Sequence, residues 1–186
     1  MNKTLLTLNL DYNTTLGSDG LAALSRGLRV NSTLQNLSLR FCGIDEHGGQ
    51  YVSNILAFSK TCIASINMEG NQLGGFGLLK LCPGLKSNAT IRSICLADNK
   101  FKPTDVIALE CFGETISKHE TLTEVSIVRN IIGNDGGLAL SRHLEQNKKI
   151  TSFKVDTTLS SKIYEVLSRI PVSEKKKGKK KASKKK

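Results

Sequence analysis

The sequence predicts an α/β solenoid of about six repeats, with a parallel β-sheet on the concave side of a short curve and helices on its convex side. Three observations support this fold. An apolar pattern recurs about every 29 residues, a stretch typical of a helix follows most copies, and the strongly basic segment is confined to the end of the chain. Repeats of this kind bury their apolar faces only against their neighbours, so they stack in one dimension.

The repeated pattern is clearest in Leu122-x-x-Val125-x-Ile127-x-x-Asn130. In this spacing the last two apolar side chains alternate along a short strand and point inward. The Asn that follows turns the chain, and its amide can satisfy backbone groups of the neighbouring repeat. Cys42 takes the place of this Asn in the second copy, and we interpret it as a small buried thiol. The copies begin near residues 5, 34, 63, 91, 122 and 150.

Helices are predicted after the strands because apolar residues four apart share one helix face. These pairs are Leu24/Leu28, Val52/Leu56, Leu81/Leu85 and Leu140/Leu144. Pro83 lacks a backbone donor, which predicts a kinked or shortened third helix. A last helix is predicted to cap the array and to stop at Pro171. Its apolar face would consist of Ile163, Val166, Leu167 and Ile170.

This pattern is that of the leucine-rich repeat, and its period resembles the ribonuclease-inhibitor type with repeats of 28–29 residues. The resemblance covers residues 2–170 and implies a parallel sheet inside a horseshoe with helices outside. We assign residues 1–171 to the repeat domain. Residues 172–186 form a lysine-rich tail, which we expect to be disordered because it has almost nothing apolar to bury.

The basic charge of the chain belongs to this tail. The formal net charge is +11, but residues 175–186 hold 9 of the 27 Lys and Arg, which leaves 18 basic against 16 acidic residues. The five cysteines are odd in number and contain no C-x-x-C, which favours reduced thiols. The sequence shows no signal peptide and no apolar run long enough for a membrane span. We therefore expect a cytoplasmic protein.

No catalytic chemistry is predicted. His47, His119 and His143 fall in different repeats, and we expect all three to be solvated. None has a partner at the spacing of metal ligands. The glycine-rich stretch at 70–77 matches no phosphate-binding motif and is explained by the repeat. We therefore expect no enzyme, no cofactor and no metal site.

The predicted binding surface is the concave face, where strand residues form columns across neighbouring repeats. Charges alternate in one column, which indicates either neutralisation between adjacent strands or a polar docking surface. Tyr12 and Phe41 lie side by side at the strand ends, where they act as interface anchors or cover a neighbouring loop. The candidate protein-binding residues are Asp11, Tyr12, Arg40, Phe41, Glu69, Asp98 and Arg129.

The first repeat is predicted to leave an exposed apolar edge. Leu5, Leu8 and Leu10 are core positions of the first strand, and only Met1 to Thr4 precede them in this sequence. Open edges of this kind invite pairing or aggregation. We expect either that the chain is a fragment of a longer array or that a partner protein covers this edge, and that the chain self-associates without it.

The tail leaves several partners open. An acidic protein surface such as the tails of tubulin is the leading candidate, and nucleic acid or nuclear import, an anionic membrane surface, and no specific partner are the others. Runs of lysine without Arg or aromatic residues favour non-specific electrostatics. The tail lysines are Lys175, Lys176, Lys177, Lys179, Lys180, Lys181, Lys184, Lys185 and Lys186.

The function predicted from these features is a non-catalytic protein-interaction scaffold. Repeat proteins of this type resemble subunits of large cytoskeletal assemblies, including microtubule-based ciliary axonemes. One alternative is a small-GTPase regulator that resembles the Ran GTPase-activating proteins, although that family has about twice as many repeats and an acidic tail. Another is an actin-end binder similar to tropomodulin. Ribonuclease inhibition is also implied by the resemblance, but that family's horseshoe is much longer.

Overall fold

The computed structural model describes residues 2–169, in which six short strands alternate with six helices. The strands are β1 (Thr7–Asn9), β2 (Asn36–Ser38), β3 (Ser65–Asn67), β4 (Ser93–Cys95), β5 (Glu124–Ser126) and β6 (Ser152–Lys154). The helices are α1 (Gly17–Leu28), α2 (Gly48–Leu56), α3 (Gly74–Ser87), α4 (Val106–Lys118), α5 (Gly133–Leu144) and α6 (Ser161–Leu167).

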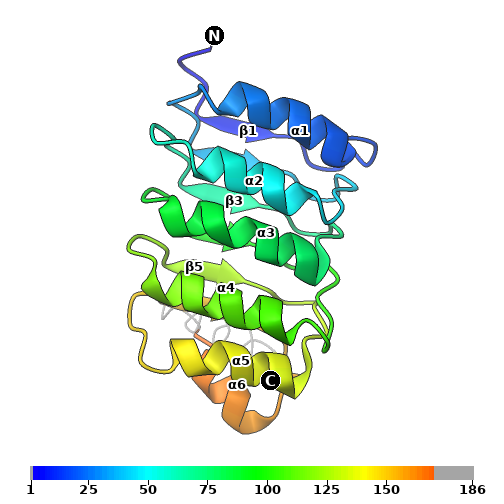
Figure 1. Cartoon of the computed structure of the whole chain (residues 1–186), viewed down its shortest axis with the longest axis vertical. Coiled ribbons are helices and arrows are strands. Elements are labelled where there is room, and N and C mark those ends of the chain that lie inside the picture. The colour runs from blue at the N-terminus through cyan, green and yellow to red at the C-terminus, as the bar shows by residue number, and fades with distance from the viewer. Residues whose placement is uncertain (1, 170–186) are drawn as a thin grey trace, which may run out of the picture.

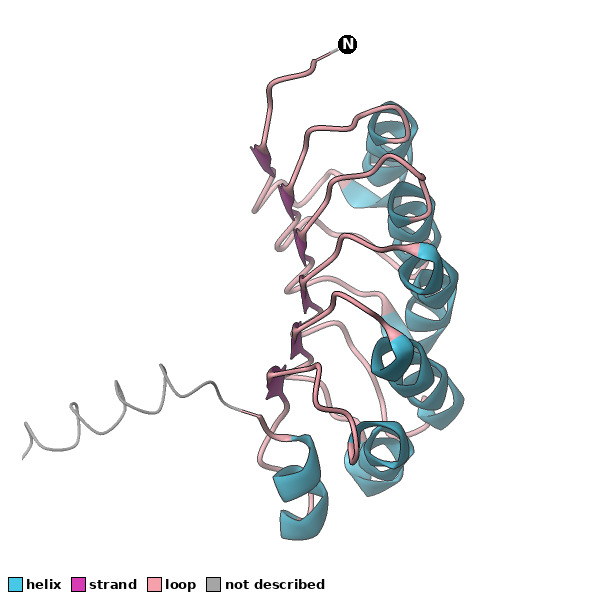
Figure 2. Cartoon of the chain, turned by 90° about the vertical axis from the view of Figure 1, so that its left-hand side faces the viewer, coloured by secondary structure: helices cyan, strands magenta, loops and turns pink. Residues whose placement is uncertain are grey.

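The strands form one parallel sheet in chain order, so the predicted solenoid is confirmed (Figure 1). The strands form one layer on the concave side of a curved array, and α1 to α5 form a second layer on its convex side (Figure 2). The register follows the repeat, because Leu37 of β2 pairs with Leu8 of β1 and with Ile66 of β3. These central strand residues point toward the helices, whereas their neighbours on each strand face outward.

Each repeat is joined to the one before it by a side chain that follows the strand. Asn71 accepts hydrogen bonds at Oδ1 from the backbone N–H groups of Cys42 (3.1 Å) and Ile44 (3.0 Å). Its Nδ2 donates to the carbonyls of Leu39 and Met68, both at 2.8 Å. The Asn71 side chain is 1% exposed, so these backbone groups have no access to water instead. One amide thus satisfies four buried backbone groups in two repeats.

In the second repeat, Cys42 takes the place of the asparagine and bonds to the backbone of the preceding repeat. Its thiol donates to the carbonyl of Leu10 at 3.0 Å, and the residue is fully buried, as predicted. Burial raises the pKa of Cys42 and keeps the donor proton on its sulfur. A thiol has no counterpart of the amide oxygen, so it supplies only the donor half of the asparagine pattern.

The turns that lead from a helix into the next strand are closed by a second set of side chains. Asn88 accepts from the N–H groups of Thr90 (2.8 Å) and Ile91 (2.7 Å), and its Nδ2 donates to the carbonyl of Leu56 (3.0 Å) in the preceding repeat. Asn2, Asn31 and Asn147 accept backbone bonds in the same way.

His119 occupies this turn in the fifth repeat, so the prediction that it is solvated is wrong. Its Nδ1 accepts from the N–H groups of Thr121 and Leu122, both at 3.2 Å, and the residue is 5% exposed. The imidazole therefore replaces an asparagine amide. Burial lowers the pKa of His119, because the charged form is poorly solvated there. His47 is exposed as expected, and His143 is only half-buried.

Helices α2 and α3 approach each other closely at glycine residues. A Cβ atom added at Gly49 would collide with the backbone of Gly77, so only glycine fits there. Pro83 does not shorten α3, which is the longest of the six helices in residues 2–169. The N–H of Gly84, which follows the proline, donates to the Ser53 hydroxyl of α2 at 2.8 Å. The neighbouring helix thus accepts a bond that the proline disturbs within α3.

The last helix ends earlier than predicted. α6 stops at Leu167, and the backbone of Arg169 pairs with that of Phe153 in antiparallel fashion at 2.9 and 3.0 Å. The Arg169 guanidinium donates to the carbonyls of Ile150 and Leu144. The chain therefore returns to cover the outer edge of β6, and α6 lies at this end of the array (Figure 1). Burial lowers the pKa of Arg169.

Ile170, Pro171, the predicted boundary at residue 171 and the lysine-rich tail lie outside the described residues. Within residues 2–169, none of the helices combines the length and the apolar character needed to cross a bilayer.

The asparagine ladder predicts unequal effects of the same substitution. We expect Asn71→Ala to lower the free energy of unfolding by about 3 kcal/mol, because it leaves four buried backbone groups without partners. Asn13 holds the corresponding place in the first repeat but is exposed and donates only to Leu10, at 2.7 Å. Asn13→Ala should cost less than about 1 kcal/mol. Equal losses in urea unfolding would contradict this account of the ladder.

His119 predicts a pH dependence of stability. Its pKa is lower in the folded protein than the value of 6.5 for a free side chain. The unfolded chain therefore binds the proton more tightly, and stability should be constant above about pH 7.5 and fall as the pH drops through 6.5. His119→Asn installs the side chain that the other turns use and should remove this fall. The comparison is made by urea unfolding between pH 5.5 and 8 at about 0.5-unit steps.

His47 and His143 are present in both proteins, so the difference between the two pH profiles isolates His119. Two parallel profiles would show that His119 is not the group responsible.

Candidate protein-binding surface

The residues after each strand form a row of turns along one rim of the concave face. At one position of the row the backbone has positive φ in five successive repeats, through Tyr12 (64°), Phe41 (50°), Gly70 (74°), Asp98 (48°) and Arg129 (60°). The N–H of Tyr12 bonds to the carbonyl of Arg40 at 2.7 Å, and that of Phe41 to the carbonyl of Glu69 at 2.8 Å. These bonds extend the sheet beyond the strands and hold the turns rigid.

Bulky residues in this backbone region are uncommon, since the left-handed conformation costs roughly 1–2 kcal/mol for a residue with a Cβ. Tyr12 and Phe41 both adopt it, next to a repeat that carries Gly70 in the same place. The glycine was the signal in the sequence that this position has positive φ. Strain of this kind is retained where the surrounding structure fixes it, and it concentrates at functional sites.

The two aromatic rings stack on each other. Their centroids are 5.2 Å apart and their planes differ by 7°. Tyr12 is 62% exposed and Phe41 is half-buried, with its ring over the backbone of Gly70. The guanidinium carbon of Arg40 lies 5.6 Å from each ring centroid. The sequence left open whether these aromatics cover a loop or remain available, and the exposure of Tyr12 favours availability.

The charged residues of the face form a chain of ion pairs. Arg40 donates from Nε to Glu69 at 3.0 Å, and its Nη1 lies 3.9 Å from Asp11. Arg129 also donates to Glu69, reaching it from two repeats away. Ala97 occupies the intervening position of this column, and its small side chain leaves the path open. The alternating charges therefore neutralise one another, which is one of the two interpretations that the sequence allowed.

Six of the seven candidate residues thus come together as one surface, which we call the rim patch. It consists of Asp11, Tyr12, Arg40, Phe41, Glu69 and Arg129. Asp98 is instead paired with Lys100 at 2.8 Å. It lines a shallow depression of about 310 Å³ together with Arg129 and Ile131.

Ile131 was missed by sequence reasoning. It is 76% exposed at the rim, in the position that follows the ladder asparagine. Gln72 and Lys100 occupy this position in the third and fourth repeats. An apolar residue where the two preceding copies carry polar ones was therefore the available signal.

The predicted N-terminal edge is partly open. Leu5 is 42% exposed, while Leu8 and Leu10 are half-buried against the core. Leu6 and Val30, which were not predicted as part of this edge, are 51% and 52% exposed. The described structure thus shows five apolar residues at this end with part of their surface in solvent.

Comparison with known proteins identifies the repeat. A family model described as a leucine-rich repeat matches residues 2–25, 30–53 and 118–141. A protein phosphatase 1 regulatory subunit 37 homolog of Caenorhabditis briggsae is 28% identical over 144 residues, which cover 77% of this chain and 15% of that protein. The ribonuclease inhibitor of Sus scrofa is 29% identical over 138 residues, which cover 72% of this chain and 29% of the inhibitor. The chain therefore spans less than a third of the length of these relatives.

Solved structures share the architecture. The tropomodulin C-terminal domain of Caenorhabditis elegans has a TM-score of 0.56 at 9% identity, covering 89% of this chain and 81% of that domain. Leiomodin-1 actin-binding site 2 has a TM-score of 0.57 at 14% identity, covering 97% and 88%. At these low sequence identities, the two structural matches show that this chain and those domains share a fold. The repeat model and the similarity to ribonuclease inhibitor, together with the six registered strands and helices, support a leucine-rich-repeat protein of the ribonuclease-inhibitor-like type.

Proposed function

We propose that the chain is a non-catalytic scaffold that binds a protein partner through the rim patch and acts within a cytoskeletal assembly of the cytoplasm. The stacked pair of Tyr12 and Phe41 carries this proposal. Two aromatic rings are held in strained turns, and Tyr12 remains 62% exposed in a chain with 5% aromatic residues. Aromatic side chains in fixed positions are typical anchors of protein interfaces.

The rim patch can bind a partner with little loss of conformational entropy and without burying an unpaired charge. Its turns are fixed by backbone hydrogen bonds, so little conformational entropy is lost on binding. Arg40 lies against both rings and already bonds to Glu69, so a partner that covers the rings does not bury an unpaired charge. Such a surface suits an apolar or aromatic segment of a protein with a polar margin.

The same ion pairs argue against nucleic acid as the ligand of this face. Phosphate binding requires several cations that are free to replace counterions. Arg40 and Arg129, the two arginines of the rim patch, both bond to Glu69. Their positive charge is therefore balanced by a carboxylate of the protein itself and is not available for phosphate groups. This favours a protein as the partner of this face.

A cytoskeletal setting is supported by the structural relatives. Tropomodulin and an actin-binding site of leiomodin-1 share the repeat array, and the second covers 97% of this chain. Actin is therefore our second candidate partner, after a microtubule-based assembly such as the ciliary axoneme. The name of the phosphatase regulatory subunit homologs is also consistent with a repeat domain that acts by binding another protein.

Two further contacts complete the proposal. The N-terminal edge of Leu5, Leu8 and Leu10 is a second apolar surface for a partner. The tail from Lys175 to Lys186 would add an electrostatic tether to an acidic surface, for which the tails of tubulin are our leading candidate.

The rim patch is tested by removing its rings. The full chain is used to capture partners from cytoplasmic extract, and the affinity of each identified partner and of purified actin is then measured by calorimetry. Tyr12→Ala and Phe41→Ala should each weaken the binding of the functional partner by more than about 1 kcal/mol in binding free energy. Aromatic anchors held in a fixed position contribute this much or more.

Phe76→Ala is the matched control. Phe76 is also aromatic and 50% exposed, but it lies on α3 of the helix layer. Its removal should leave the affinity unchanged. An equal effect at all three positions, or none at Tyr12 and Phe41, would refute the rim patch as the binding surface.

The tail makes a separate prediction. The full chain should bind tubulin about tenfold more tightly in low salt than a chain that ends at residue 171, because nine lysines attract its acidic tails. The difference should vanish in high salt, where the attraction is screened. Co-sedimentation with microtubules, before and after proteolytic removal of the tubulin tails, measures it. Binding that is insensitive to salt and to those tails would rule out the tether.

A further inference from the structure

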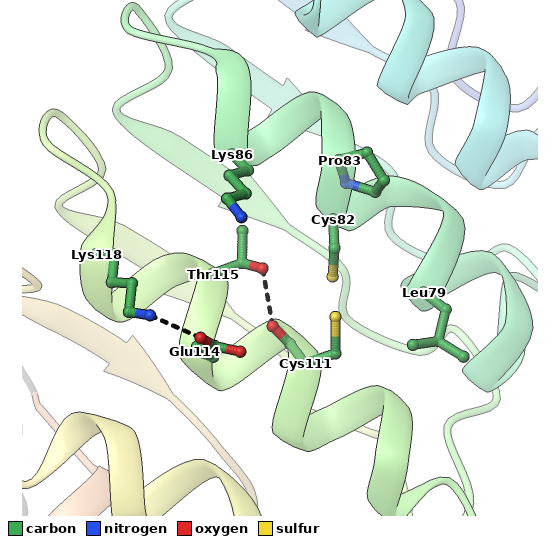
Figure 3. Close-up of a pocket in the computed structure, with 8 residues that line it drawn as sticks. All are labelled: Leu79, Cys82, Pro83, Lys86, Cys111, Glu114, Thr115 and Lys118. Atoms are coloured by element: carbon green, nitrogen blue, oxygen red, sulfur yellow. Dashed lines mark hydrogen bonds and ion pairs between the residues drawn. The ribbon is translucent and has the colours of Figure 1, made fainter.

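A groove of about 390 Å³ runs along the convex side between α3 and α4 (Figure 3). It is separate from the rim patch, which lies at the opposite layer. Apolar and charged side chains line it, and it opens to solvent. The lining residues are Leu79, Cys82, Pro83, Lys86, Cys111, Glu114, Thr115 and Lys118.

Two thiols face each other in this groove. Figure 3 shows the sulfur atoms of Cys82 on α3 and Cys111 on α4 pointing toward one another across the helix interface. The two thiols are close enough to affect the ionisation of Cys82, and both are free. Cys82 also donates to the carbonyl of Leu78 at 3.3 Å, which fixes its side chain. The stacking of repeats thus brings together two cysteines that are 29 positions apart in the sequence.

The two thiols differ in their surroundings. Cys82 is 3% exposed, and burial together with the neighbouring Cys111 raises the pKa of Cys82 to about 12. It therefore stays protonated and unreactive toward reagents in solution. Cys111 is half-buried at the groove, so a small molecule in the groove meets its sulfur first. The cations of Lys86 and Lys118 also line the groove, and Lys118 pairs with Glu114 at 2.6 Å.

A simpler role exists for Cys82 alone. The segment Leu81-Cys82-Pro83-Gly84-Leu85 matches Leu24-Ser25-Arg26-Gly27-Leu28 and Leu140-Ser141-Arg142-His143-Leu144. Val52-Ser53-Asn54-Ile55-Leu56 also matches it, so the position accepts a small residue, and serine fills it in the first, second and fifth repeats. Space filling explains a small side chain at residue 82, but it does not explain a second thiol aimed at the first from the neighbouring helix.

We propose that Cys82 and Cys111 form an oxidisable dithiol site, which hydroperoxides convert into a disulfide that joins α3 to α4. This goes beyond a scaffold function, since it gives the helix layer a covalent modification. The two residues come from adjacent repeats, so the bond would lock the third repeat to the fourth across the groove.

The reaction balances in two steps. The Cys111 thiolate attacks one oxygen of the hydroperoxide, the O–O bond breaks, and an alcohol leaves after taking up a proton. Cys111 is then a sulfenic acid. The Cys82 sulfur attacks the Cys111 sulfur, the S–S bond forms, and the S–O bond breaks, with the departing hydroxide leaving as water with the Cys82 proton. The two thiols lose two electrons and two protons in total, and the hydroperoxide is reduced.

The experiment uses the full reduced chain and hydrogen peroxide. After a timed exposure, free thiols are blocked with N-ethylmaleimide, and intact mass and non-reduced peptide maps are recorded. We expect a monomer that has lost two hydrogen atoms, a linked peptide pair containing Cys82 and Cys111, and full reversal by dithiothreitol. The oxidised protein should also unfold at a higher urea concentration than the reduced one, because the bond closes a loop in the unfolded chain.

Cys82→Ser is the matched variant, because three other repeats carry serine there and the fold accepts it. Its Cys111 should stop at the sulfenic acid, which dimedone labels. In Cys111→Ser, the Cys82 thiol should remain reduced throughout the exposure.

Cys62 provides the comparison within the same molecule. It is exposed, so reactivity governed by exposure alone would oxidise it first and give linked dimers. The proposal is overturned if dimers linked through Cys62 form while Cys82 and Cys111 stay open to N-ethylmaleimide after unfolding. It is also overturned if either cysteine is found joined to a different partner, or if Cys111 proceeds to higher oxidation states without a disulfide.

Discussion

The side-chain hydrogen bonds between successive repeats are the interaction on which the rest of this structure depends. The strands are only three residues long, so the sheet by itself satisfies few backbone groups. Asn71 and Asn130 supply the missing partners, each bonding at its oxygen to two N–H groups of the preceding repeat and at its nitrogen to nearby carbonyls. Since these groups are buried, an unsatisfied one costs about 1–3 kcal/mol. The ladder therefore fixes both the register and the spacing of the repeats.

The rim patch follows from this register. Once the strands are aligned, the turn residues after them stack in rows, and side chains of different repeats meet at fixed distances. Tyr12 stacks on Phe41 because the two residues hold the same place in successive repeats. The left-handed backbone that presents them is maintained by hydrogen bonds to the next repeat. The same stacking brings Cys82 to Cys111 on the other layer. A solenoid thus converts a sequence period into columns of side chains, and function is set by what each column carries.

The fold was predictable because its determinants are local and repeated. Leu37, Ile66 and Ile94 are core residues for the same reason in each copy, and six copies confirm one another. The residues of the candidate surface were predictable, but the ion pairs between them were not. The sequence placed Arg40 between Asp11 and Glu69, yet the bond from Arg129 to Glu69 crosses a whole repeat and depends on the small Ala97 between them. The prediction that His119 is solvated was wrong, and of the two effects predicted for Pro83 the shortening of the third helix was wrong. Each residue was judged within its own repeat, whereas the backbone groups beside both are satisfied by packing between repeats.

By itself, the amino-acid sequence determined the repeat, its period, the residues of the core and the strand-ending positions that carry asparagine. These features depend only on the spacing and the type of residues along the chain, so they can be identified from the sequence directly. Only the tertiary structure decided which side chains meet. It showed that His119 replaces an amide, that α2 accepts a bond from the backbone beside Pro83, and that Arg169 closes the edge of β6. The physical reason is that such partners lie in neighbouring repeats, so their geometry exists only after the repeats have stacked.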